Sequence, residues 1–150
     1  MAFALGFVCV IGVNRVTAEE PATYVGAEVC AECHEDEFAS YSANAKKAHS
    51  YQSVALMKQR NRLTDSEYKE CLHCHSTGYG HPGGFISVEA TPHLKNAGCE
   101  VCHGPGSKHA DSMDPEDIKG SLTVDDCTTC HNAERVNSFR FRPLIYGGGH

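Results

Sequence analysis

One short pattern, Cys-x-x-Cys-His, occurs four times in this chain of 150 residues. Two thiols three positions apart lie on one side of a helical turn, where they can add to the two vinyl groups of one haem. The histidine that follows is then carried under the ring and binds the iron from the proximal side. The spacing therefore predicts four haem c groups with iron, each attached covalently. The attachment residues would be Cys30, Cys33, Cys71, Cys74, Cys99, Cys102, Cys127 and Cys130. The proximal ligands would be His34, His75, His103 and His131.

Paired cysteines also serve two other chemistries. Cys-x-x-Cys pairs build four-cysteine zinc sites, and exported proteins form disulfides. Neither chemistry requires a histidine after every second cysteine. With 10 histidines in 150 residues, four such coincidences have a chance on the order of one in fifty thousand. Haem attachment is therefore favoured over zinc and over disulfides.

The six other histidines are candidates for the distal side of the iron. His49 follows a helical pattern of apolar residues, His109 follows a proximal histidine across a Gly-Pro-Gly turn, and His150 follows an apolar run. We expect these three to be distal ligands, so that most haems have histidine on both sides and a low potential. His73 lies inside a motif and is expected to point outward. Three distal candidates leave one of the four haems without a partner. We expect that haem either to be capped by His81 or His93 or to stay five-coordinate. Met57 is expected to fill the core.

The N-terminus has the features of an export signal. Residues 3–13 are apolar and too short for a bilayer, which needs about 20 residues. Small residues then precede a polar stretch, as at a signal-peptidase site. We interpret residues 1–18 as a signal peptide and residues 19–150 as one tetrahaem cytochrome c domain; an uncleaved anchor is the alternative. A periplasmic or otherwise exported location agrees with c-type haem attachment.

Composition predicts a thin core and restricts the partners. The formal net charge is −6, which disfavours binding to nucleic acid. Trp is absent and only 8% of residues are aromatic, so a chain of this size needs additional staples. We expect a compact multihaem cytochrome in which the haems form the core. The fold class is mainly α, with long loops and at most a small β-hairpin.

Local patterns place the motifs on helices. Apolar residues at steps of three and four predict one amphipathic helix over 38–49, with 54–57 continuing it or beginning a second turn. A capping box at 64–67 and a helix cap at 123–126 predict the helices that enter the second and fourth motifs. Asp114 with Pro115 marks a further helix start. Residues 78–84 are rich in glycine and break any helix, and 85–88 are expected to form a short strand.

Several of these segments resemble the four-haem cytochrome c-554 family, whose members carry electrons from hydroxylamine oxidoreductase in ammonia oxidisers. The similarity rests on Ala48-His49, on the stretch from Cys74 to Phe85, on Gly-Cys-Glu-Val-Cys-His-Gly-Pro-Gly-Ser-Lys-His at 98–109, and on a Phe-x-Phe stretch before a late histidine. The resemblance implies distal ligation by His49, His109 and His150. It also implies that the haem bound through His75 lacks a distal protein ligand. Two further histidines, His81 and His93, depart from that pattern.

Pattern and resemblance together favour a periplasmic electron carrier over an enzyme. Its partners would be a redox protein donor and acceptor. A hydroxylamine oxidoreductase-like enzyme, a quinone-linked or other cytochrome, and a membrane-associated protein all fit this description. One alternative is nitrogen-oxide redox activity at an open His75 haem. The other is self-assembly into a cytochrome filament or complex, in which His150 would bind a neighbour's haem.

Overall fold

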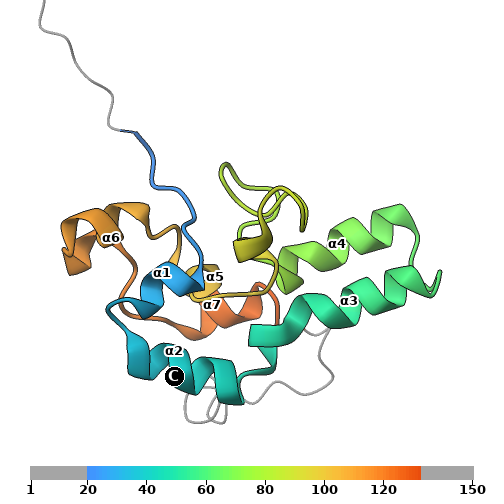
Figure 1. Ribbon diagram of the computed structural model, residues 1–150, viewed down its shortest axis with the longest axis horizontal. Coiled ribbons are helices and arrows are strands. Elements are labelled where there is room, and N and C mark those ends of the chain that lie inside the picture. The colour runs from blue at the N-terminus through green and yellow to red at the C-terminus, as the bar shows by residue number, and fades with distance from the viewer. Residues whose placement is uncertain (1–19, 133–150) are drawn as a thin grey trace, which may run out of the picture.

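Short helices joined by long loops make up residues 20–132, the part of the chain that the computed structural model describes (Figure 1). This range contains no strand, so the expected mainly α fold class is confirmed. None of its helices is long and apolar enough to cross a membrane. The α-helices are α1 (Ala27–Ala31), α2 (Glu35–Asn44), α3 (Ser50–Gln59), α4 (Asp65–His75), α5 (Glu100–His103), α6 (Ser107–Ser112) and α7 (Val124–Thr128). Short 3-10 turns are η1 (Lys46–His49), η2 (Pro92–Leu94) and η3 (Pro115–Asp117).

The single helix expected over 38–49 is broken. Helix α2 ends at Asn44, and Ala45 is extended, with φ −88° and ψ 119°. Its side chain is buried, and the 3-10 turn η1 then leads into α3. Periodicity could not reveal the break, because burying Ala45 redirects the chain without interrupting the spacing of apolar residues.

Helices α3 and α4 lie side by side and run in opposite directions (Figure 1). The capping box expected at the start of α4 is present. The Thr64 hydroxyl accepts from the Glu67 N–H at 3.2 Å, and the Glu67 carboxylate accepts from the Thr64 N–H at 2.8 Å. The two helices are joined further by a 2.8 Å hydrogen bond between the hydroxyls of Tyr51 and Tyr68. This hairpin fixes the direction in which α4 delivers the second motif.

The strand expected at 85–88 is wrong. The Phe85 N–H donates to the Thr77 carbonyl at 2.9 Å, but the next N–H donates to the Thr91 hydroxyl instead of to a partner strand. The loop is drawn so tightly that a Cβ on Gly84 would overlap the carbonyl of Gly78. A short run rich in apolar residues after a glycine-rich stretch predicted a strand here, whereas the loop buries only the aromatic ring of Phe85 and leaves Ile86 exposed.

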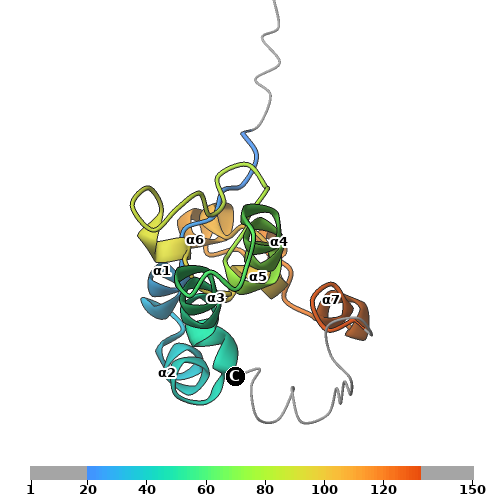
Figure 2. The same cartoon turned by 90° about the vertical axis from the view of Figure 1, so that its right-hand side faces the viewer.

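The apolar core of the described residues is small. Leu72, Phe85 and Leu94 form its centre, between α3, α4 and the loop that follows α4. Helices α1, α2, α6 and α7 bury no side chain at all. Figure 2 shows α7 set apart from the other helices. The polypeptide without attached groups therefore provides an apolar core for the second motif only and leaves the other three motifs without one.

A buried carboxylate ties the motif helices together in place of that core. Glu100 is 2% exposed and lies at the start of α5. Its oxygens accept from the N–H groups of Val25, Gly26 and Gly106 at 2.8 to 3.2 Å. The first two donors precede α1, and the third precedes α6. One side chain thus joins the first motif, the third motif and the turn that follows it.

Replacing Glu100 with Ala should therefore destabilise the haem-loaded protein strongly. A buried donor left without a partner costs about 1–3 kcal/mol, so three of them predict a loss of at least about 3 kcal/mol in the free energy of unfolding. Denaturant unfolding would measure this, with the exposed Glu32→Ala as the matched control, expected to change stability by less than about 0.5 kcal/mol. Equal midpoints for the two variants would contradict this role of Glu100.

Candidate haem sites

All four Cys-x-x-Cys-His motifs form the same local structure. In the first, third and fourth motifs the histidine N–H donates to the carbonyl of the first cysteine, at 2.9, 3.1 and 2.9 Å. The second motif occupies the last turns of α4. In each case a helical turn brings both thiols to one side and places the histidine directly after them. The local geometry thus agrees with the attachment chemistry expected of the motif.

The eight motif cysteines are free thiols. Within residues 20–132, no three or more Cys, His, Asp or Glu side chains converge into a set that could hold a metal ion. The thiols are therefore arranged as pairs along four separate turns, which differs from the tetrahedral arrangement of a structural zinc site.

Thiols from different motifs meet. Cys30 of the first motif hydrogen-bonds to Cys99 of the third, which lowers the pKa of Cys99 to about 7 and raises the pKa of Cys30. In the same way Cys74 of the second motif contacts Cys130 of the fourth, whose pKa is raised to about 12, first by burial and then by this hydrogen bond. The fold therefore pairs the first motif with the third and the second with the fourth.

Three histidines present the same ring nitrogen to a backbone carbonyl. The Nδ1 atom of His75 lies 2.8 Å from the Ser50 carbonyl, that of His103 lies 2.7 Å from Lys119, and that of His109 lies 2.8 Å from Asp114. A carbonyl oxygen only accepts, so Nδ1 must carry the hydrogen and Nε2 keeps its lone pair. Metal-ligating histidines are held in this way, with the second ring nitrogen bound to an outer partner.

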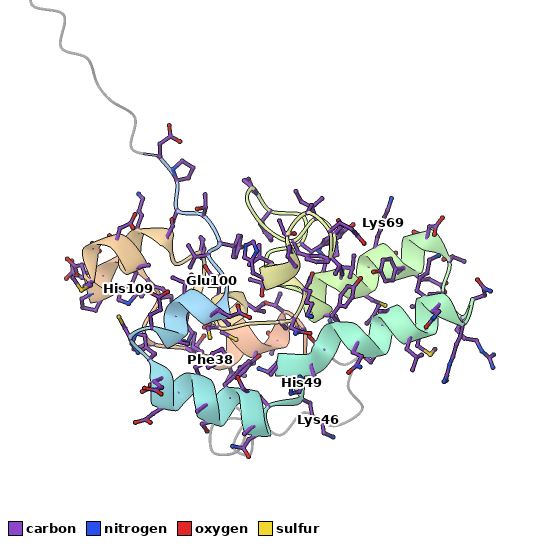
Figure 3. The ribbon with its side chains drawn as sticks, viewed as in Figure 1. Phe38, Lys46, His49, Lys69, Glu100 and His109 are labelled. Carbon is purple, nitrogen blue, oxygen red and sulfur yellow. The ribbon has the colours of Figure 1, made fainter. Side chains whose placement is uncertain are left out.

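His34 and His109 face each other. Their ring centroids are 6.2 Å apart and their planes are inclined by 27°. Two imidazoles that bind one metal from opposite sides, with metal–nitrogen bonds of about 2.0–2.1 Å, place their centroids about 6 Å apart. Helix α6 carries His109 toward the first motif (Figure 3). His34, the expected proximal ligand of the first haem, and His109, a candidate distal ligand whose haem the sequence does not specify, thus have the separation that a shared iron needs.

The other candidate distal residues are arranged differently. His49 is exposed at the junction of η1 and α3 (Figure 3), and its Nε2 lies 3.2 Å from the Ser42 carbonyl. His73 is exposed as expected, with its ring edge-on to Tyr79. His81 is exposed, as is His93, which packs against Gly26 before the first motif. His150 and the expected signal peptide lie outside the described residues.

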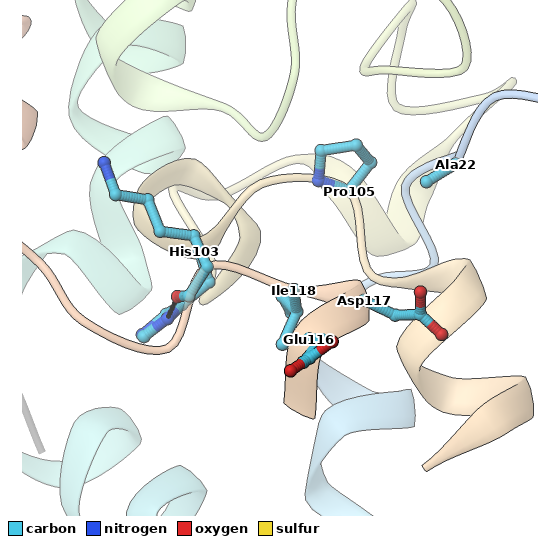
Figure 4. A pocket seen from close by; sticks show the side chains of 7 residues that line it. Ala22, His103, Pro105, Glu116, Asp117 and Ile118 are labelled. Atoms are coloured by element: carbon cyan, nitrogen blue, oxygen red, sulfur yellow. Dashed lines mark hydrogen bonds between the residues drawn. The ribbon is translucent and has the colours of Figure 1, made fainter. Parts of the chain in front are cut away.

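An open pocket of about 410 Å³ adjoins the third motif (Figure 4). It is lined by His103, Pro105 and Lys119, together with the carboxylates of Glu116 and Asp117. The Lys119 carbonyl accepts from Nδ1 of His103, so two of the lining residues are hydrogen-bonded to each other. No second-motif residue contributes to the lining. The pocket is therefore separate from the open position suggested for the His75 haem.

Two residues that the sequence did not single out support the motifs. Glu100 occupies a spacer position of the third motif, where any residue type is allowed, and Ser50 follows His49 in an ordinary helical pattern. Nothing in either pattern indicates the long-range hydrogen bonds that these side chains make. The residues present fit haem c: paired thiols on helical turns, histidines whose Nδ1 is held by a backbone carbonyl, and a protein core too small without additional groups.

Comparison with known proteins gives the same picture. A curated relative, cytochrome c-554 of Nitrosomonas europaea, is 33% identical over 93 residues, which cover 57% of this chain and 40% of the relative. A second relative, the multiheme cytochrome MtrC of Shewanella baltica, is 25% identical over 150 residues, covering 82% of this chain and 23% of the relative. The chain thus spans less than half the length of either. No solved structure matches it significantly.

The family model described as cytochrome c554 and c-prime matches residues 29–104, about half of the chain. The matched range contains the first three motifs and ends one residue after the third, at 104; the fourth motif begins at Cys127, outside it. The chain belongs to the cytochrome c554 and c-prime family, whose cofactor is haem c.

Proposed function

We propose that the protein is an exported electron carrier that holds four haem c groups. The observation that carries this proposal is the repetition of one helical turn at all four motifs, each with two free thiols and a histidine. Bound haem iron would supply one-electron redox chemistry. The chain itself would attach each ring through its paired cysteines and hold the proximal histidines His34, His75, His103 and His131 in place.

Histidine on both sides of the iron is proposed for most haems. The facing rings of His34 and His109 support it for the first haem, because their separation of 6.2 Å suits a shared iron. The Asp114 carbonyl fixes the His109 tautomer that leaves Nε2 free. His49 and His150 are proposed as the other two distal ligands, on the resemblance stated above. A bis-His set lacks the methionine that raises the potential, so low potentials follow.

The contacts between motifs support a continuous path for electrons. Cys30 adjoins Cys99, and Cys74 adjoins Cys130, so rings attached at these thiols would lie next to one another. Cys102 of the third motif is close enough to Cys127 of the fourth for the two to interact electrostatically. We therefore propose that electrons pass between the first and third haems, the third and fourth, and the fourth and second.

Transfer between redox proteins then needs a donor and an acceptor, which we propose to be other redox proteins. A periplasmic location and removal of residues 1–18 remain part of the proposal, because c-type haem is attached outside the cytoplasm. Nitrogen-oxide chemistry at the His75 haem and assembly into a larger cytochrome complex are the alternatives. A high-spin haem iron would favour the first alternative over the carrier. Growth of filaments at high protein concentration would favour the second.

The number of haems per chain tests this proposal directly. Intact mass and haem absorbance should both give four haem c groups per chain. The double variant Cys71→Ser, Cys74→Ser should lose one of them and keep three, because each motif attaches its own ring. A wild-type count below four, or a double variant that still carries all four haems, would contradict the assignment.

Removing the proposed distal ligand of the first haem gives a second test. The variant His109→Ala should convert one low-spin haem into a high-spin haem with an open position, visible by electron paramagnetic resonance. His73→Ala, which removes an exposed histidine outside the proposed ligand set, should leave every spin state unchanged. If His109→Ala also leaves all haems low-spin, His109 is not the ligand. A high-spin haem already present in the wild type would favour the nitrogen-oxide alternative.

A further inference from the structure

Ser50 makes a two-way contact with the proximal histidine of the second motif. Its hydroxyl donates to the His75 carbonyl at 3.0 Å, and its own carbonyl accepts from Nδ1 of the His75 ring at 2.8 Å. The same hydroxyl accepts from the N–H of Ala97 at 3.0 Å. Both the backbone and the ring of His75 are therefore held by one buried residue, which also anchors the loop leading to the third motif.

The carbonyl that holds the ring is shared with a second donor. The Ser53 hydroxyl, one turn further along α3, donates to the Ser50 carbonyl at 2.9 Å. A carbonyl oxygen has two lone pairs and its donors compete for electron density. The Ser53 hydroxyl therefore weakens the bond that the oxygen makes to the His75 ring.

The strength of that bond matters to a metal on the other ring nitrogen. A stronger hydrogen bond from Nδ1–H makes the imidazole a more basic ligand, and hydrogen bonding around the ligand is one of the protein's means of tuning a haem. Stronger donation to iron favours its oxidised state. The contacts around Ser50 would thus affect the potential of the second haem. This is the haem at which the enzyme alternative, unlike the carrier, requires an open position on the iron.

We propose that Ser50 and Ser53 are positioning residues that together set the donor strength of His75 and thereby the potential of the second haem. Ser50 holds the ring in a strong hydrogen bond, and the Ser53 hydroxyl moderates it. This inference rests on the proposed function, because it requires a haem attached at Cys71 and Cys74.

Two variants should move the potential of the second haem in opposite directions. Ser53→Ala removes the competing donor, strengthens the His75 bond and should shift the midpoint potential downward. Ser50→Ala keeps the carbonyl but releases the backbone of His75, so the ring bond lengthens and the potential should shift upward. The two signs distinguish tuning from damage to the fold, which would move the potential similarly in both variants.

The measurement is a redox titration of the haem-loaded protein, followed by visible and electron paramagnetic resonance spectra. The second haem is identified as the component missing from the Cys71→Ser, Cys74→Ser variant. Asn44→Ala is the matched control, because the exposed Asn44 side chain also donates to a helical carbonyl on its own helix, that of Ser40, at 3.0 Å and lies outside every haem-attachment motif. It should leave the potential of the second haem unchanged. Ser53 is exposed, so its variant should fold normally.

Opposite shifts confined to the second haem would support the inference. The inference would be overturned if the potential of the second haem were the same in Ser53→Ala as in Asn44→Ala, or if it moved in the same direction in both serine variants. Peptide mass analysis distinguishes failure of this inference from failure of the proposed function. If the peptide with Cys71 and Cys74 carries no haem in the wild type, the proposed function fails as well.

Discussion

The carboxylate of Glu100 holds together parts of the chain that little else connects. It accepts N–H donors from the segment before α1 and from the turn before α6, while its own backbone begins α5. A buried charge is costly in free energy unless it is fully hydrogen-bonded. Separating the three segments would leave the Glu100 carboxylate without its donors, so this cost opposes their separation. The same segments are joined a second time where Thr23 and Ser107 exchange hydrogen bonds at 2.8 and 3.1 Å. The first motif, the third motif and His109 on α6 owe their relative positions to this junction. The facing rings of His34 and His109 follow from it.

The described residues supply only a small apolar core. Its buried apolar cluster serves α3, α4 and the loop after α4, and leaves the remaining motif helices without buried apolar side chains of their own. Large flat groups tethered at four pairs of thiols would fill that space and add apolar contact area. Function and stability would then depend on the same groups. The hydrogen bonds of Glu100 and Ser50 show how the chain can orient the ligands of such groups without a large core.

The sequence predicted the motif chemistry, the mainly α fold class and the helix caps at Thr64 and Thr123, because each depends on neighbours within a few residues. Prediction from the sequence failed where tertiary contacts determine the local structure. Apolar spacing continued through Ala45, but the burial of that residue turns the chain and breaks the helix. The apolar run at 85–88 indicated a strand, but the Thr91 hydroxyl accepts from the Ile86 N–H, which a strand would need for a partner strand. Glu100 and Ser50 could not be found from local pattern, since their partners lie far away in sequence, at Gly26 for the first and at His75 for the second.

We propose that the four motifs make one connected set of one-electron centres. Coulometric reduction of the haem-loaded protein, starting from its fully oxidised form, tests this proposal, because it counts electrons independently of any assumed extinction coefficient. The expected result is an uptake of four electrons per chain, all from one electrode. A plateau at fewer than four electrons, with the protein fully reduced, would contradict it.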